Sequence, residues 1–306
     1  MPVTSALIIE PRNHVTLDWV IDNVSKTLPD VPIHFHHGLK NEKLAHAISR
    51  VYPKVQLHNM GVENLSIGEY SNYMTQSSLY ENLPEGHTIV FQTDSAFCNP
   101  EAEDNIERLN ELCEYDYVGA PWKFWTNQGV GGNGGFSLRN TKTMTRLGQI
   151  LEERTSATDI ECENSSERTN CTAEGSSNPD KSCVTTCRKI AAKKRHPEDL
   201  KISKLCQNDP DCALPTLLEA AEFQNQHEDF TAATTDSEVV KEPVSGRRCL
   251  KTKRLDTIGF HKPEKVCHRL QACPSLEDFP WRKRGNMTDS ELQMKIAELE
   301  KNIFEK

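Results

Sequence analysis

The sequence has no apolar stretch long enough to cross a membrane, where a helix needs about 20 apolar residues. Its first apolar run, residues 6–9, ends at Glu10. The opening residues also lack the basic segment that begins a secretory signal peptide. We therefore read residues 3–9 as a buried strand, and we expect a soluble, cytoplasmic protein without a membrane span.

The sequence also lacks the excess of positive charge typical of nucleic-acid binders. Lysine and arginine number 36 against 45 acidic residues, which gives a net charge of −9. A general nucleic-acid binder gains its affinity by neutralising phosphates, so nucleic acid is not an expected partner. Basic residues do cluster at 188–195 and 247–254. Such runs are usually solvated surface, and contact with an anionic donor or acceptor is the alternative.

No Cys-x-x-Cys pair occurs, so a zinc site has weak support. Cysteine is nevertheless abundant, with 11 residues, several of them in the polar segment between Cys162 and Cys212. We favour a few disulfides around this segment, which would imply an oxidising compartment and keep the secretory pathway open. Asn-x-Ser/Thr triplets point the same way; they begin at Asn23, Asn64, Asn164, Asn170 and Asn286.

Short apolar runs alternate with amphipathic stretches through the first half of the chain. The predicted strands are 3–9, 33–35, 55–57 and 88–91, and the predicted helices are 14–28, 42–51, 70–82 and 105–113. Such strand–helix units indicate an α/β fold with a mainly parallel sheet flanked by helices, whose ligands gather beyond the carboxyl ends of the strands. At 306 residues, one α/β domain with an elaboration is the default.

The second half continues this pattern and adds two appendages. We predict a strand around 117–118, a Gly-rich segment that leads through 136–139 into a helix ending near 153, and a further helix beginning near Pro197. The segment 155–190 is polar and Cys-rich, so we expect a flexible insertion in a domain of residues 1–285. A capping box at Thr288 begins an amphipathic helix in residues 286–306. This helix can pack on its own domain, the favoured reading, or form a homodimer.

Three features carry candidate chemistry, each with a structural alternative. Asp94 follows a buried strand, so its carboxylate must face water, a cation or a partner; it can bind a metal, or cap the turn before Pro100. Glu198 and Asp199 can cap a helix, or one of them can act as a general base. His261 closes a short strand and is either structural or a late second metal ligand.

The Gly-rich segment 129–135 matches neither a phosphate loop nor a dinucleotide fingerprint. We read it as a loop whose backbone passes close to a ligand, with the Asn133 amide nearby; a structural bulge is the alternative. Trp122 lies on a loop near the same edge. Its ring can stack on a sugar or pack in the core.

The order of these features resembles an uncharacterised glycosyltransferase-like domain family of fungi, algae and large viruses. The resemblance covers roughly residues 3–265, apart from the insertion. It rests on Glu10-Pro-Arg12, Gly68-Glu-Tyr-Ser-Asn72, Phe91-Gln-Thr-Asp-Ser95, Tyr115-Asp-Tyr-Val-Gly-Ala-Pro-Trp122, Gly132-Asn-Gly-Gly-Phe-Ser-Leu-Arg139, Pro197-Glu-Asp199 and Ile258-Gly-Phe-His261. The chain is more distantly similar to inverting β1,3-glycosyltransferases of the Fringe and core-1 type.

The resemblance implies a GT-A-like, Rossmann-type fold that binds a nucleotide sugar and Mn²⁺ or Mg²⁺. It implies metal ligands at Asp94 and His261, and a catalytic base at Asp199 beside Glu198. The nucleotide would lie near Glu10, Arg12, Ser95 and Lys262. The donor and acceptor sugars would lie near Trp122, Asn133, Gly134, Gly135 and Arg139.

One departure concerns the metal. The family's Asp-x-Asp pair is Asp94-Ser95-Ala96 here, so the second carboxylate is missing, and Ser95 or a water is left to fill its place. We predict a metal-dependent glycosyltransferase that moves a sugar from a nucleoside diphosphate sugar, expected to be a UDP-sugar, to a hydroxyl of a glycan or protein with inversion. The alternatives are a non-catalytic sugar- or partner-binding module and a nucleotidyltransferase, which usually has a basic Gly-rich loop after its first strand.

Overall fold

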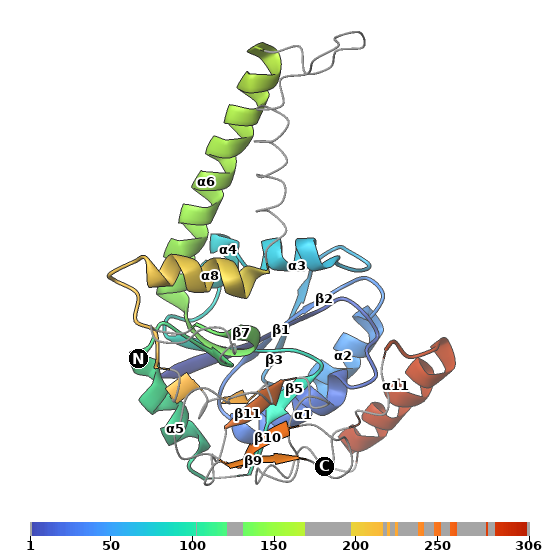
Figure 1. Ribbon diagram of the computed structural model, residues 1–306. Coiled ribbons are helices and arrows are strands. Elements are labelled where there is room, and N and C mark those ends of the chain that lie inside the picture. Colours follow the sequence, from blue (N-terminus) through green and yellow to red (C-terminus); the bar gives the residue numbers. More distant parts are fainter. Residues whose placement is uncertain are drawn as a thin grey trace.

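The computed structural model describes residues 2–101, 103–120, 131–168, 197–216, 219–220, 224–225, 238–241, 248–251, 258–261, 280 and 285–304. A six-stranded sheet of order β3-β2-β1-β4-β7-β6 forms its centre (Figure 1). The strands are β1 (Val3–Glu10), β2 (Ile33–His37), β3 (Val55–Asn59), β4 (His87–Phe91), β6 (Tyr117–Ala120) and β7 (Asn133–Asn140). Only β7 runs antiparallel to its neighbours in this sheet. This is the α/β arrangement, a mainly parallel Rossmann-type sheet flanked by helices, that the sequence predicts.

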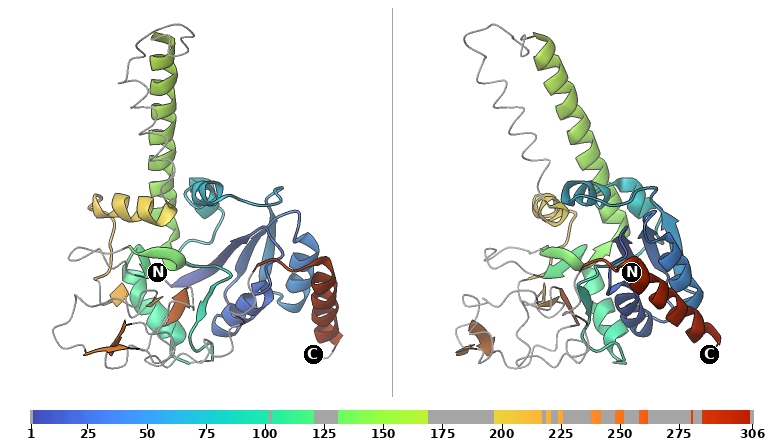
Figure 2. Two further views of the ribbon diagram at one scale, coloured as in Figure 1. Left: turned by 45° about the vertical axis from the view of Figure 1, so that its right-hand side comes forward. Right: turned by 90° about the vertical axis from the view of Figure 1, so that its right-hand side faces the viewer.

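Helices cover both faces of the sheet (Figures 1 and 2). Beneath one face, the core joins the sheet to α1 (Leu17–Thr27), α2 (Glu42–Val51), α5 (Asn105–Glu111) and α11 (Asp289–Phe304). Over the other face, it joins the sheet to α4 (Ser77–Glu81), the start of α6 (Thr141–Arg168) and α8 (Glu198–Gln207), and α3 (Ile67–Tyr73) lies on the same side. A sheet covered on both faces needs apolar residues on both, which is why the central strands are almost continuously apolar.

The predicted helix 70–82 is two helices, α3 and α4, separated by a turn. The reason lies far along the chain, because the carboxylate of Glu152 accepts hydrogen bonds from the Ser77 backbone N–H at 2.9 Å and its hydroxyl at 3.0 Å. This carboxylate caps the start of α4. Gly148 lets α6 approach that closely, since a Cβ there would lie 2.8 Å from the Ser77 nitrogen. The prediction failed because the cap is a tertiary contact.

Helix α6 corrects a second prediction. We expected it to end near residue 153, but it continues through Arg168 and extends away from the sheet (Figure 2). The first part of the expected insertion, residues 155–168, is therefore helical. The remainder, residues 169–190, lies outside the described residues.

Shorter strands complete the described part. A three-stranded sheet has the order β5-β11-β8, built from Ser95–Phe97, Gly259–His261 and Gln224–Asn225. A two-stranded sheet pairs β9 (Glu238–Lys241) with β10 (Arg248–Lys251), and a 3-10 turn, η1, spans Leu112–Glu114. Strand β5 was not predicted, because three residues are too few to show a period.

Helix α11 packs on its own domain, as favoured from the sequence. Leu292 and Leu299 are buried in the core beneath the sheet. Arg50 of α2 forms an ion pair of 2.6 Å with Glu300, and Lys295 pairs with Asp18 of α1. The apolar stripe is therefore used within the chain, which leaves a homodimer through this stripe without support.

One predicted class of cross-link is present. Cys206 and Cys212 form a disulfide, with Cα atoms 5.1 Å apart, and Cys98 is disulfide-bonded as well. The prediction of disulfides rather than a zinc site is therefore confirmed for Cys206 and Cys212. Among the described residues, no helix is both long and apolar enough to span a bilayer.

Candidate active site

The candidate site lies at the edge of the central sheet where the parallel strands end. Strand β1 ends at Glu10 and β4 ends at Phe91. Because β7 is antiparallel to β4, it begins at this same edge with Asn133. Segments that are far apart in the sequence therefore meet where α/β proteins bind their ligands.

Glu10 and Arg12 form a fork at this edge. The Arg12 guanidinium donates from Nε and Nη2 to the two Glu10 oxygens, each at 2.8 Å, and the Arg12 backbone N–H adds a third bond of 2.9 Å. The Asn41 amide donates to the backbone oxygens of both residues. Glu10 is buried whereas Arg12 is exposed, so the carboxylate aims the guanidinium outward. Its bonds to Glu10, with the charges of Glu10 and Asp94, raise the pKa of Arg12.

Asp94 is half-buried in the turn between β4 and β5. The turn is held by its neighbours, because the Thr16 hydroxyl donates to the Thr93 carbonyl and the Ser95 hydroxyl accepts from the Gln92 N–H at 2.8 Å. Burial lowers the pKa of the His14 imidazole, and the negative charge of Asp94 partly offsets this by raising the same pKa. Asp94 is thus an electrostatic neighbour of the fork at Glu10.

Strand β11 brings His261 to the same turn. It pairs antiparallel with β5, and His261 lies opposite Ser95, the residue after Asp94. The two predicted metal ligands, 167 positions apart in the sequence, therefore come from neighbouring backbone positions. No group of three or more His, Cys, Asp or Glu side chains converges as a metal cage within the described ranges. A cation held by one or two protein ligands and by phosphate oxygens needs no such cage.

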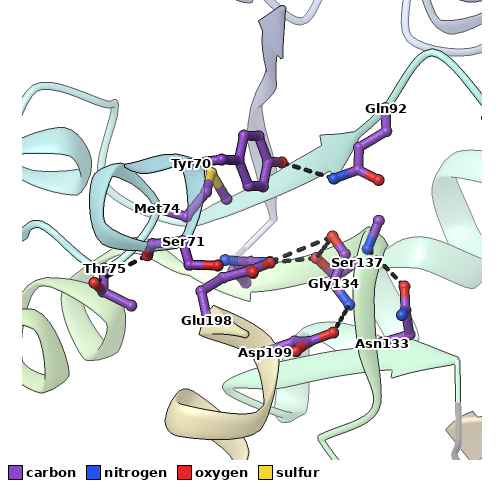
Figure 3. Close-up of polar contacts among 12 residues, drawn as sticks. Tyr70, Ser71, Met74, Thr75, Gln92, Asn133, Gly134, Ser137, Glu198 and Asp199 are labelled. Atoms are coloured by element: carbon purple, nitrogen blue, oxygen red, sulfur yellow. Dashed lines mark hydrogen bonds and ion pairs between the residues drawn. The ribbon is translucent and has the colours of Figure 1, made fainter. Parts of the chain in front are cut away.

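Glu198 and Asp199 begin α8 and face the start of β7 (Figure 3). Both residues are buried, at 6% exposure each. The Gly134 N–H donates to Oδ2 of Asp199 at 3.1 Å, and the Leu200 N–H donates to Oδ1 at 2.7 Å. Burial raises the pKa of Glu198, the charge of Asp199 raises it further, and Arg139 lowers it. The predicted acidic pair therefore lies at the sheet edge in a fixed orientation.

The glycines here are explained by contacts within the protein. A Cβ on Gly134 would lie 2.6 Å from both the Arg139 guanidinium and the Glu198 carboxylate. Gly132 has φ +89°, a conformation that side chains rarely adopt. The Asn133 carboxamide oxygen accepts from the Gly135 N–H at 2.9 Å. The structural alternative thus accounts for both glycines, because Gly134 lets α8 approach β7 and Gly132 lies against the backbone of β6.

Two predicted contact residues are fully enclosed. The Ser95 hydroxyl donates to the carbonyl of Gly135 or of Gln92, each at 3.0 Å, and both Ser95 and Arg139 are 0% exposed. We therefore assign them to support of the site rather than to direct ligand contact. Trp122 and Lys262 lie outside the described residues.

Sequence reasoning gave no role to Tyr70 and Gln92, which join α3 to the end of β4. The Gln92 carboxamide donates to the Tyr70 hydroxyl at 2.9 Å (Figure 3). Burial raises the pKa of Tyr70, and the charge of Glu198 raises it further. Both residues stand inside motifs quoted for the resemblance, and that position was the available signal.

The fold and this edge define an α/β protein of Rossmann type with carboxylates grouped at the strand ends. Residues 54–239 match the model of a family described as "Protein of unknown function (DUF5672)". The match covers more than half of the chain, and the chain belongs to this family. No curated protein matches it.

Two solved structures of the glycosyltransferase GlyE from Streptococcus pneumoniae TIGR4 are similar in backbone structure to part of this chain. The apo form matches with a TM-score of 0.31 and 12% identity, over 61% of this chain and 44% of its own. The second matches with a TM-score of 0.30 and 13% identity, over 60% and 43%. The chain thus spans less than half the length of the GlyE structures.

Proposed function

We propose that this protein is a metal-dependent glycosyltransferase that uses a nucleoside diphosphate sugar, with UDP as the expected nucleotide. One observation carries the proposal: the peptide segment at Gly134 and Gly135 connects the turn that holds Asp94 to the acidic pair at the start of α8. Its Gly135 carbonyl contacts Ser95, beside Asp94, and its Gly134 N–H contacts Asp199. A donor's diphosphate and its sugar would therefore lie over one short stretch of backbone.

In this proposal Asp94 holds Mn²⁺ or Mg²⁺ together with the donor's diphosphate oxygens, and His261 is the expected second ligand. When bound, such a cation offsets the charge that develops on the leaving diphosphate. Arg12, aimed outward by Glu10, adds a fixed positive charge at the same edge. A guanidinium suits a diphosphate because it is always charged and donates in a planar fork.

Asp199 is the proposed general base. It would take the proton from an acceptor hydroxyl while that oxygen bonds to the anomeric carbon and the bond to the diphosphate breaks. Its oxygens accept hydrogen bonds from the backbone N–H groups of Gly134 and Leu200, which fix the orientation of the carboxylate at the sheet edge. The backbone of residues 133–135 would lie beside the donor sugar. Single displacement of this kind inverts the anomeric configuration.

A second candidate, a non-catalytic sugar-binding module, is favoured by one observation. Ala96 occupies the position of the missing second acid, and it is fully buried in β5 opposite Phe260. The site therefore has one carboxylate at this turn where the family pattern has two. A weakened metal site is compatible with binding without turnover.

The two candidates separate in a donor-hydrolysis assay with a panel of UDP-sugars, run with Mn²⁺ and with chelator. A transferase releases UDP only with metal, and Asp94→Asn abolishes both this release and the Mn²⁺-dependent binding of UDP in calorimetry. Asp30→Asn, which changes an exposed acid of 98% side-chain exposure, is the matched control. Metal-independent binding without UDP release would establish the module, and unchanged Mn²⁺–UDP binding by Asp94→Asn would remove Asp94 from the site.

A further inference from the structure

Arg139 on β7 is a charged side chain with no solvent exposure. Its guanidinium donates to the Tyr80 hydroxyl at 2.8 Å, to the Ser137 hydroxyl at 2.9 Å and to the Gly134 carbonyl at 3.3 Å. It also lies over the ring of Tyr117, 5.2 Å from the centroid. An arginine enclosed on all these sides cannot touch a sugar at the sheet edge. Its function must be exerted through its neighbours.

The neighbour that matters is Glu198. Its Oε1 lies 3.6 Å from Nη2 of Arg139, and both side chains are buried. Asp199 follows directly in α8, so two carboxylates are removed from water side by side. Burial and like charge both favour protonation of such a pair, and a nearby cation opposes it. Arg139 supplies that cation from beneath the site.

The Gly134 peptide connects the arginine to the second carboxylate. Its carbonyl accepts from Arg139 and from the Ser137 hydroxyl, the latter at 3.1 Å. Its N–H donates to Asp199 at 3.1 Å. One peptide unit is therefore fixed on one side by the arginine and fixes Asp199 on the other. Moving the guanidinium would release both carboxylates at once.

We propose that Arg139 is a positioning residue, which keeps Glu198 ionised and holds Asp199 in place through the Gly134 peptide. It makes no contact with donor or acceptor. The link to turnover rests on the proposed function, in which Asp199 is the base. The effect on the two carboxylates does not depend on any activity.

Melting temperatures test the carboxylate half directly. Arg139→Met should lower the melting temperature by roughly 10 °C at pH 8, because one partner of a buried ion pair is left alone. The loss should be smaller at pH 5.5. Without Arg139 the folded-state pKa of Glu198 rises further above its unfolded value. A group with a raised folded-state pKa stabilises the fold at low pH, where it is protonated, and this stabilisation is lost as the pH rises.

The double variant Arg139→Met/Glu198→Gln is the decisive control. Removing the unpaired charge should recover at least half of the lost melting temperature and abolish its added pH dependence. A double variant no more stable than Arg139→Met at either pH would overturn the proposal. If Arg139→Met does not fold, Tyr80→Phe replaces it, because that change removes one acceptor from the guanidinium and leaves the charge in place.

Turnover distinguishes positioning from mere structural support. The acid limb of the pH profile for donor hydrolysis should move up by about one pH unit in Arg139→Met, because the carboxylates lose their cation and share a proton more readily. It should move up by less in Tyr80→Phe, where the charge stays but the guanidinium loses one of the hydrogen bonds that fix it near Glu198. Each variant should lose this displacement in the Glu198→Gln background. A tenfold higher KM for the donor with an unchanged melting temperature would show direct ligand contact and sink the proposal. If wild type hydrolyses no donor, the proposed function fails while the melting temperatures still decide the role of Arg139.

Discussion

Two polar clusters lie on the same face of the central sheet, and they differ in how their titratable groups are stabilised away from water. The ion cluster comprises Arg139, Glu198 and Asp199. The histidine cluster comprises His34 and His36 of β2 and His58 of β3. Backbone register places them on one face, because Leu7 of β1 pairs with both His34 and Val90, and Val90 pairs with Ser137, two residues before Arg139. Helix α3 contributes Tyr73 to one cluster and Tyr70 beside the other.

The ion cluster sets its carboxylates against a buried cation, whereas the histidine cluster stacks imidazoles on one another. Its His34 and His36 are buried and its His58 is half-buried. The rings of His36 and His58 stack 4.5 Å apart, and Nδ1 of His34 lies 3.1 Å from Nε2 of His58. Burial first, and then the neighbouring imidazoles, lower the pKa of His34 to about 4 and that of His36 to about 3. Nε2 of His34 is buried with no hydrogen-bond partner among the described residues, so a proton added there would have no acceptor.

The comparison shows which cluster is suited to chemistry. A buried and oriented carboxylate can take a proton from a substrate hydroxyl, whereas an imidazole with a pKa of about 3 or 4 is a poor base at neutral pH. The histidine cluster is therefore structural at neutral pH. Its expected influence is on stability in acid.

The largest expected effect separates the clusters by turnover. Asp199→Asn should lower the rate of sugar transfer by about 10² to 10⁴-fold, the usual worth of a general base, with donor affinity nearly unchanged. His58→Gln should keep wild-type turnover at pH 7.5. Steady-state kinetics with a saturating donor measures both. If Glu198→Gln proves the more damaging change, the base is misassigned within the pair, and if both acid variants stay active, the base lies elsewhere or configuration is retained.

The next effect tests how tightly the ion cluster is packed. Gly134→Ala should destabilise the fold by about 3 kcal/mol, because a Cβ would lie 2.6 Å from enclosed atoms of Arg139 and Glu198. Gly68→Ala is the matched control, since a Cβ there meets nothing closer than 4.0 Å and alanine favours the helix. Urea unfolding measures both variants. Equal stability of the two would show that α8 does not pack on Gly134 in solution.

Acid should act through the histidine cluster. Its imidazoles are neutral in the folded state, while the unfolded chain binds protons below its ordinary histidine pKa of about 6.5. Stability should therefore fall as pH drops below 6.5, and the fall should continue toward the folded-state values of about 4 and 3. We expect a loss of roughly 2 kcal/mol between pH 7 and pH 5.

Substitution identifies the residues responsible for that loss. His34→Gln/His36→Gln should flatten the dependence of unfolding free energy on pH. His46→Gln should keep it, because His46 is exposed and its change leaves the cluster intact. Parallel pH curves for the double variant and wild type would assign the acid sensitivity to other groups.

The smallest effect compares one hydroxyl in each cluster. Tyr80→Phe leaves a buried guanidinium N–H without its acceptor, so we expect a loss of about 2 kcal/mol. Tyr73→Phe removes a 2.8 Å bond to the neutral imidazole of His36, and should cost about 1 kcal/mol or less. Chemical denaturation resolves this difference, and a larger loss from Tyr73→Phe would contradict the charge-based reasoning.

Much of the fold was predictable because it depends on local patterns. The predicted helix 42–51 matches α2 at both ends, and predicted strands 3–9 and 88–91 match β1 and β4 within one residue. The period of apolar residues fixes such elements, since both faces of the sheet are covered. The position of Asp94 beyond β4 followed from the same pattern.

The elements that were missed depend on distant contacts. The break between α3 and α4 depends on Glu152, which caps the start of α4. The extension of α6 through Arg168 has no periodic pattern of apolar residues from which it could be predicted. The site shows the same division. Composition cannot show that Ser95 and Arg139 are enclosed, because their exposure depends on which strands and helices cover them.

The sequence by itself determined the order of strands and helices, the carboxylate after β4 and the acidic pair at the start of α8. These follow from periodicity and from residue types within a few positions of one another. Only the tertiary structure decided that β11 sets His261 beside Ser95, that Gly134 lies between Arg139 and Asp199, and that three histidines share one buried face. Each of those contacts joins residues distant in sequence, and strand register and helix packing, rather than local preference, determine which of them meet.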